Sequence, residues 1–339
     1  MNDHLDLADK PATADVHREV PDTAAVRAAP VTLTRQLSAE QAFRRIAASC
    51  REQIAANHAA VARGNAPEAL HQMRVGLRRL RSALDLYAPL LELPEALRAD
   101  LRWLGEQLGA ARDWDVLASS TLPRMAESLP DDMELVLVRL AAETRANDLR
   151  AAAADAVSTE RYVELMRNLG DWLHDAAWRG HCTARQRKTL SKLALGFADK
   201  ALAQSRKRLL KRGRRLRASG ANSGANKGAN KGAGRGAKAR HRVRIAAKRA
   251  RYAADFFQSL YPKRQVRTYI AGLAGLQDEL GRLNDTAVAD GLLKKLQHGE
   301  ARLDGSAAFT RGYLASTTHG GRRKLRKLWR RVEKMRPPG

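Results

Sequence analysis

Apolar side chains recur every three or four residues through almost the whole chain after residue 37, which is the spacing of an amphipathic helix. No stretch alternates apolar and polar residues as a half-buried strand does. We therefore expect an all-α protein. The expected helices cover residues 38–62, a segment that opens after Asn65, and residues 94–117, 122–155, 159–175, 185–217, 240–260, 265–283, 286–296 and 306–335.

Two segments lack this pattern. Residues 1–37 are rich in Ala, Asp, Pro and Thr without periodicity, which predicts a disordered N-terminal tail. Residues 218–239 are rich in Gly, Ala, Asn, Ser and Lys, with Gly-Ala-Asn at 220, 224 and 228, and this composition predicts a flexible linker. The linker divides a helical domain, residues 38–337, into a first half (38–217) and a second half (240–337).

One pattern occurs in both halves, 170 positions apart. Each copy begins with a histidine, continues with basic residues at three- and four-residue spacing, and ends on an aspartate and an aromatic residue. The first copy is His71-Gln72-Met73-Arg74-Val75-Gly76-Leu77-Arg78-Arg79-Leu80-Arg81, with Asp85 and Tyr87 beyond. The second copy is His241-Arg242-Val243-Arg244-Ile245-Ala246-Ala247-Lys248-Arg249-Ala250-Arg251, with Asp255 and Phe257 beyond.

On a helix, this spacing separates charge from apolar surface. At about 100° per residue, His71, Arg74, Arg78, Arg81 and Asp85 fall within an arc of about 80°, and the opposite face is covered by Met73, Leu77, Leu80, Leu84 and Tyr87. The basic row spans about 10 Å, which suits a ligand with several negative charges in line. A charge run is more often a solvated face, but duplication of the row together with its histidine favours an anion site. We expect Asp85 and Asp255 to pair with Arg81 and Arg251 one turn back.

A second pair of segments supports a duplication. Residues 104–113 (LGEQLGAARD) match residues 276–285 (LQDELGRLND) at an offset of 172, so that one connection differs in length by two residues. A duplicated helical unit can pack about a pseudo-twofold axis. This arrangement would bring the two basic faces into one cleft or channel.

The composition agrees with an anionic partner. The chain has 62 Lys and Arg against 36 Asp and Glu, a formal net charge of +26, and the excess lies after residue 37. No apolar stretch approaches the roughly 20 residues of a bilayer span, and the first residues do not resemble a signal peptide. Two isolated cysteines, Cys50 and Cys182, fit a reducing compartment. We expect a cytoplasmic protein that does not insert into membranes.

These motifs resemble the CHAD domains, a family named for its histidine-bearing α-helical repeat. The resemblance covers about residues 38–337 and rests on the two His/Arg segments, the Leu-Gly-x-x-Arg/Asn-Asp turns and the basic run 206–214. It implies two pseudo-symmetric four-helix bundles of antiparallel helices around a basic central cavity that binds inorganic polyphosphate, often on cytoplasmic granules. The contacts that it implies are Arg74, Arg78, Arg79, Arg81, Arg244, Lys248, Arg249 and Arg251, with Arg208, Lys211 and Arg212 contributing.

His71 and His241 admit three readings: phosphohistidine nucleophiles, pH-dependent ligand contacts, or structural residues at the helix start. We favour the second and third readings, and we count both histidines as candidate binding residues. Phosphoryl transfer needs carboxylates that hold Mg²⁺ or a Walker-type loop, and the chain has no G-x-x-x-x-G-K-[ST] motif. Asp113 and Asp285 are more often caps or ion-pair partners than metal ligands. We therefore expect a non-catalytic binding protein with no cofactor and no resident metal.

The same cations would attract RNA or DNA, which is the main alternative to polyphosphate. Single-strand binders usually stack bases on aromatic side chains, but only 5% of this chain is aromatic and the basic faces contain none. A polyphosphate-metabolising enzyme is a weaker alternative. The basic terminal segment 322–331 is expected to be a packed final helix rather than a membrane-surface helix.

Overall fold

The computed structural model describes residues 24–129, 132–221, 229–316 and 321–339, and in these ranges the chain is helical, with one isolated β-bridge between Ser38 and Leu193. The prediction of an all-α protein is confirmed. The main helices are α1 (Ala39–Ala56), α2 (His58–Ala62), α3 (Pro67–Tyr87), α4 (Glu95–Val116), α5 (Leu122–Ala126), α6 (Met133–Val157), α7 (Glu160–His174), α8 (Ala184–Leu190), α9 (Ala194–Ala221), α10 (Ala229–Phe257), α11 (Lys263–Gly299), α12 (Asp304–Ser316) and α13 (Gly321–Lys334). A single π-helical turn, η1 (Leu117–Thr121), joins α4 to α5.

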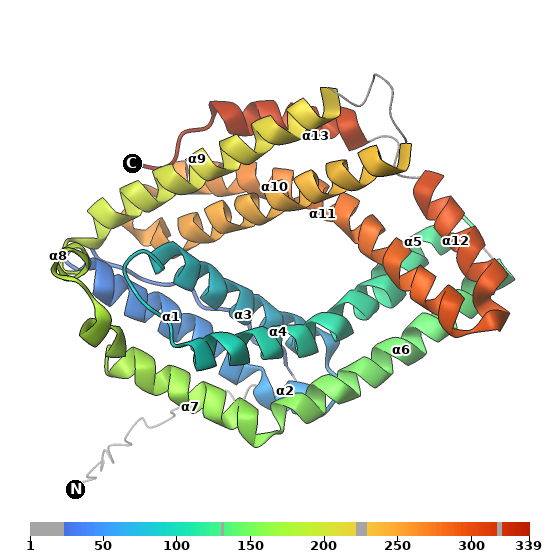
Figure 1. The fold of residues 1–339 in the computed structure, drawn as a ribbon, viewed down its shortest axis with the longest axis horizontal. Coiled ribbons are helices and arrows are strands. Elements are labelled where there is room, and N and C mark those ends of the chain that lie inside the picture. The colour runs from blue at the N-terminus through green and yellow to red at the C-terminus, as the bar shows by residue number, and fades with distance from the viewer. Residues whose placement is uncertain (1–23, 130–131, 222–228, 317–320) are drawn as a thin grey trace, which may run out of the picture.

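The helices are arranged in two groups that face each other (Figure 1). The helices α1–α4 and α7 form one group, and α9, α10, α11 and α13 form the other. At one end α8 connects the groups, and at the opposite end α5, α6 and α12 lie against the far half of α11. The His/Arg helices α3 and α10 therefore come from opposite groups.

The buried apolar side chains form two clusters. The larger cluster combines residues of both halves, such as Phe43, Leu77, Phe257 and Trp329. The smaller cluster lies where α4, η1, α5 and α6 meet α11 and α12, with Trp114 and Leu293 among its members. The larger core thus crosses the boundary between the two predicted halves, and α3 and α10 are held against each other by a shared apolar base.

Several predicted helices differ in length from the observed ones. Predicted helix 38–62 is broken at Asn57, whose side-chain nitrogen donates to the Gln53 carbonyl at 2.7 Å. The helix expected to open after Asn65 is α3: its N-cap is Ala66 rather than Asn65, no side chain caps it, and Pro67 occupies its first turn. Predicted helices 122–155 and 185–217 are each divided in two, and predicted helix 306–335 corresponds to α12 and α13, between which residues 317–320 lie outside the described ranges. The predicted pair 265–283 and 286–296 is one continuous helix, α11, in which Thr286 Oγ1 donates back to the Arg282 carbonyl at 3.1 Å.

The predicted tail is ordered over residues 24–37, and residues 1–23 lie outside the described ranges. Val31 and Leu33 are buried, and the backbone is bound at two points. The Val26 amide donates to Asn57 Oδ1 at 3.0 Å, and the Leu33 amide donates to Ser259 Oγ at 2.8 Å. The tail prediction fails here because the apolar residues of this segment, which lack helical periodicity, pack against the helical core.

Part of the predicted linker is helical. Helix α9 continues to Ala221 and α10 begins at Ala229, so that residues 218–221 and 229–239 are helical rather than flexible, and residues 222–228 lie outside the described part of the chain. Alanine, the strongest helix former, recurs among the glycines of this segment.

The C-terminal helix α13 packs on the fold, as expected from the sequence. Trp329 and Val332 are buried in the larger core, and the Trp329 ring occupies the space that a side chain at Gly213 of α9 would fill. Arg206 of α9 donates from Nε to the Met335 carbonyl at 2.7 Å, at the end of α13. Among the described helices, none combines the length and apolar character that a membrane span needs.

Candidate anion-binding site

Helix α3 separates its two faces as the spacing predicts. Met73, Leu77 and Leu80 are buried against the core, where Gly76 lets α1 approach closely: a Cβ there would lie 3.0 Å from Ile54 Cγ1. The opposite face carries His71, Arg74 and Arg78, all partly buried.

Helix α10 repeats the arrangement. Val243, Ala247 and Ala250 are buried, whereas Arg244 and Lys248 are partly buried on the other face. Contacts between the two helices fix them together. Arg78 Nε donates to the Tyr252 hydroxyl at 2.8 Å, and the Arg79 guanidinium lies 5.8 Å from the centroid of the Phe256 ring.

Four cations of the two helices act on one another, and we call Arg74, Arg78, Arg244 and Lys248 the central cluster. Burial lowers the pKa of Lys248 to about 7, with the charges of Arg78, Arg244 and Arg74 adding to the effect. Burial also lowers the pKa of Arg74 and of Arg244, and each lies within the field of the other repeat's cations. The repeated basic faces therefore converge on one region.

Two carboxylates reach this region from the second pair of repeated segments. Asp113 of α4 lies 3.6 Å from Arg74 Nη2, and Asp285 of α11 is the carboxylate whose charge acts most strongly on Arg244. Asp113 and Asp285 are also within each other's field. Burial raises the pKa of Asp113, against the lowering by Arg74. Equivalent acids of the duplication thus oppose equivalent cations.

Arg112 belongs to the same region, although sequence reasoning did not select it. Its charge acts on both His71 and Arg74. The repeat alignment pairs Arg112 with Asn284, and this pairing hides the basic character of the position in one copy. One feature of the sequence could have indicated Arg112: it directly precedes Asp113 in the duplicated segment 104–113.

Glycines of α4 make room for the arginines of α3. A Cβ at Gly109 would lie 2.6 Å from Arg74 Nη1, and a Cβ at Gly105 would lie 2.6 Å from Arg81 Nη2. Each guanidinium therefore lies directly on the α4 backbone. At Gly281, the position equivalent to Gly109 in the second half, no atom lies within 4 Å of an added Cβ.

The two repeat histidines have different surroundings. Burial lowers the pKa of His71 to about 4, and the charge of Arg112 contributes, so that the imidazole is neutral at pH 7. Its Nδ1 is buried and has no hydrogen-bond partner among the described residues. His241 is exposed, with Nδ1 3.4 Å from Asn284 Oδ1. His71 is thus partly buried among the charges of the first repeat, whereas His241 is open to solvent.

Arg79, another predicted contact, is buried and bound to a neighbouring helix. It is only 9% exposed, and its Nη1 donates to Gln53 Oε1 at 2.8 Å. Gln53 in turn donates to Gln72, which donates to Glu68 Oε1 at 2.8 Å. Arg79 therefore anchors α3 to α1 through a chain of hydrogen bonds.

Three further predicted contacts are committed to other partners. Arg81 donates to the Leu101 carbonyl of α4. Arg249 lies 2.5 Å from Asp85, so the expected Arg81–Asp85 pair is replaced by an ion pair between α10 and α3. Arg251 does pair with Asp255, at 3.9 Å. Asp85 binds across the helix pair because Arg81 reaches α4 instead.

The predicted contacts of α9 are mostly exposed. Arg208 and Lys211 are exposed and Arg212 is partly buried, and the charges that act most strongly on Arg74, Arg244 and Lys248 do not include these three. No group of three His, Cys, Asp or Glu residues in the described part of the chain has the geometry to hold a metal ion. Cys182 is buried and donates to the Leu90 carbonyl at 3.2 Å, and burial raises the pKa of Cys50 to about 12.

Comparison with known proteins gives one family. The family model described as CHAD domain matches residues 45–294. Among solved structures, the CHAD domain of the plant Ricinus communis is 36% identical with a TM-score of 0.78, and the match covers 93% of this chain and 99% of that one. PptA from Streptomyces chartreusis shares the fold at 13% identity and a TM-score of 0.59, over 86% of this chain and 99% of its own. No curated protein matches.

Proposed function

Because the chain belongs to the CHAD domain family, which is associated with polyphosphate binding in general, we propose that the central cluster binds inorganic polyphosphate. The observation that carries the proposal is the convergence of Arg74 and Arg78 of α3 with Arg244 and Lys248 of α10. Each helix alone would carry a row of like charges that destabilises it. Together the rows form a region where several phosphoryl groups of one chain find cations on two sides.

The chemistry of the side chains suits phosphoryl oxygens. Guanidinium groups bind them through two parallel N–H donors, and an ammonium group acts as a point charge. Arg74, Arg78, Arg244 and Lys248 are each only partly buried, so part of every cationic side chain stays accessible to a ligand. Two carboxylates, Asp113 and Asp285, oppose the four cations of the cluster and Arg112 beside them. The region therefore keeps a net positive charge that an anionic chain would offset.

We propose binding without phosphoryl transfer. Asp113 is occupied by Arg74, and Asp285 faces Arg244, so both carboxylates serve as counter-charges to the cluster. Incubating the purified protein with polyphosphate and Mg²⁺ tests this directly, because release of inorganic phosphate would show turnover.

The central test is charge reversal. Arg74, Arg78, Arg244 and Lys248 are changed together to Glu, and we expect high-affinity binding of long-chain polyphosphate in a calorimetric titration to be lost while the helix content by circular dichroism is kept. The matched control reverses four exposed basic residues of α8 and the following turns of the chain: Arg185, Lys188, Lys192 and Lys200. The control carries the same change of net charge and should still bind. If the cluster variant bound as tightly as the unsubstituted protein, the site would be wrong.

Nucleic acid is tested in the same titration. Tyr252 lies beside the cluster but is only 3% exposed, and its hydroxyl is bound to Arg78, so its ring is not presented for base stacking. We expect long-chain polyphosphate to displace RNA oligomers at much lower concentration than the reverse. Equal affinities would favour a general nucleic-acid binder.

Binding of this kind would bring the protein to cytoplasmic polyphosphate granules. A fluorescent fusion should gather on the granules, and the four-residue cluster variant should remain diffuse. A cluster variant that still gathered on granules would place the recruiting contact elsewhere in the chain.

A further inference from the structure

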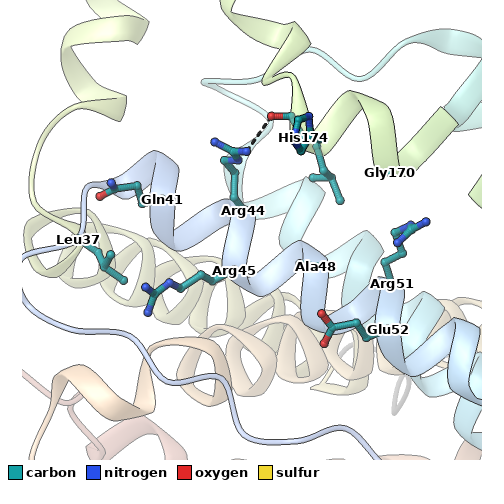
Figure 2. Close-up of a pocket in the computed structure, with 10 residues that line it drawn as sticks. Leu37, Gln41, Arg44, Arg45, Ala48, Arg51, Glu52, Gly170 and His174 are labelled. Atoms are coloured by element: carbon teal, nitrogen blue, oxygen red, sulfur yellow. Dashed lines mark hydrogen bonds between the residues drawn. The ribbon is translucent and has the colours of Figure 1, made fainter. Parts of the chain in front are cut away.

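A second group of arginines lies on the outer side of α1, where α1 faces α7 (Figure 2). It surrounds a hollow of about 440 Å³, which we call the outer hollow and which falls within the usual range of about 300–1,000 Å³ for small-ligand pockets. Arg44, Arg45 and Arg51 are its basic residues, and Glu52 is its acid. The function proposed for the central cluster does not involve these residues.

Each of the three guanidinium groups is held by a backbone carbonyl of another segment. Arg44 Nη2 donates to the His174 carbonyl at 2.7 Å, as drawn in Figure 2. Arg51 Nε donates to the Met166 carbonyl at 3.0 Å, and Arg45 Nη1 donates to the Thr32 carbonyl at 3.3 Å. A guanidinium has five N–H donors, so each side chain is positioned and keeps donors for a ligand.

The positive charge of the outer hollow is not neutralised by contact. None of the three arginines forms an ion pair with a carboxylate in the described ranges. Glu40, whose charge acts on Arg44, has both oxygens engaged: Oε1 accepts from Trp178 Nε1 at 2.8 Å, and Oε2 accepts from Arg179 Nη2 at 2.6 Å. Three cations against one exposed carboxylate leave a net positive surface.

Gly170 of α7 shapes the hollow. A Cβ at this position would lie 3.0 Å from Arg51 Nη2 and 3.1 Å from Arg51 Cζ. The missing side chain therefore lets the Arg51 guanidinium lie flat on α7. This arrangement repeats, on the outside of the fold, the way in which Gly109 receives Arg74.

We propose that the outer hollow is a second anion site, which binds a phosphoryl group through Arg44 and Arg51. The two residues are seven positions apart and lie on one face of α1. Ile46, Cys50 and Ile54, on the opposite face, are buried in the core between α1 and α3. The apolar core thus separates the outer hollow from the central cluster, and the two sites bind independently.

The test uses the full chain with the four central cations changed to Glu, so that the central site does not contribute. We expect this protein still to bind tripolyphosphate in a calorimetric titration. Adding Arg44→Gln and Arg51→Gln should weaken that binding about tenfold or more, the effect of removing charge-assisted hydrogen bonds. The matched control adds Arg185→Gln and Lys188→Gln on α8 and should leave it unchanged.

Gly170→Ala in the same background provides a variant that keeps every charge and hydrogen-bonding group. It should weaken tripolyphosphate binding by displacing Arg51, with the helix content and thermal unfolding unchanged. Long-chain polyphosphate is titrated in parallel. If Arg44→Gln and Arg51→Gln weaken the binding of long-chain polyphosphate alone, the outer hollow binds a phosphoryl group of a long chain. If they weaken the binding of tripolyphosphate, it binds a small free anion. If neither ligand responded to the arginine pair or to Gly170→Ala, the outer hollow would not be an anion site.

Discussion

Whether a basic residue of the repeated pattern serves an anion depends on what its side chain already contacts. Arg74 and Arg79 are five positions apart on α3, yet Arg74 lies in the central cluster, whereas Arg79 is buried on Gln53. The helical spacing predicts the face on which each residue lies. It does not predict a partner such as Gln53, which is 26 positions away on α1.

The neighbours of Lys248 should make polyphosphate binding depend on pH. Burial and the adjacent arginines lower the pKa of Lys248 to about 7, and a bound anion would raise it again. Binding then takes up a proton. The affinity should be greatest below pH 7 and fall as the pH rises from 7 toward the higher pKa of the complex, by up to about tenfold per pH unit.

Lys248→Arg is the matched variant, because arginine stays protonated throughout this range. Titrations from pH 7 to pH 9 should show a sloping affinity for the unsubstituted protein and a flat one for Lys248→Arg. Parallel slopes in both proteins would show that another group titrates. His71, with a pKa of about 4, is neutral over the whole interval in the free protein.

At the level of the helix, α3 and α4 act as a pair: α3 supplies guanidinium groups, and α4 supplies glycines whose backbone the guanidinium groups contact. Gly109→Ala should displace Arg74 and weaken polyphosphate binding by about 1 kcal/mol, or about fivefold. Gly281→Ala, the equivalent change in the second half, has free space around it and should leave binding unchanged.

Alanine has a higher helix propensity than glycine by about 1 kcal/mol, so the unfolding temperature of Gly281→Ala should not be lower than that of the unsubstituted protein. Calorimetric titration of the two variants side by side separates the displacement of Arg74 from the general effect of an added methyl group. Equal affinities for the two variants would remove the proposed role of Gly109.

The sequence predicted the existence and type of the helices better than their ends. The periodicity located α3, α4, α7 and α10, but it did not show the break at Asn57, because the break depends on a side-chain contact with Val26 in a segment expected to be disordered. It also divided α11 near Asn284 and Asp285, two residues that usually disfavour a helix interior. Tertiary packing of Leu276, Leu280 and Leu293 in the two cores overrides this preference.

At the scale of the whole molecule, a formal charge of +26 does not mean that every cation binds the ligand. Five cations lie in or beside the central cluster: Arg74, Arg78, Arg112, Arg244 and Lys248. By analogy with single-stranded nucleic acid, about five phosphate contacts give a slope of about −3 to −4 in a plot of log affinity against log salt concentration.

This slope is measured by repeating the titration at several salt concentrations. A slope near −6 would mean that about eight cations take part. The arginines that the structure commits to other partners, such as Arg81 and Arg249, would then have to leave them.

The duplication was readable from the sequence, and the convergence of its basic faces follows from it. The prediction of two four-helix bundles remains a prediction, because the larger apolar core joins residues of both halves. Shared burial of this kind depends on contacts between segments about 170 positions apart, which a local pattern does not encode.

The ordered segment 24–37 has a practical consequence for anyone who produces the protein. One of its ends is bound to Asn57 in the first half of the chain, and its Leu33 is bound to Ser259 in the second half. A truncated protein that starts at Ser38, where the helical periodicity begins, would lose these hydrogen bonds to both halves together with two buried apolar side chains. A truncation that starts before Thr23 keeps them and is the safer choice for crystallisation trials.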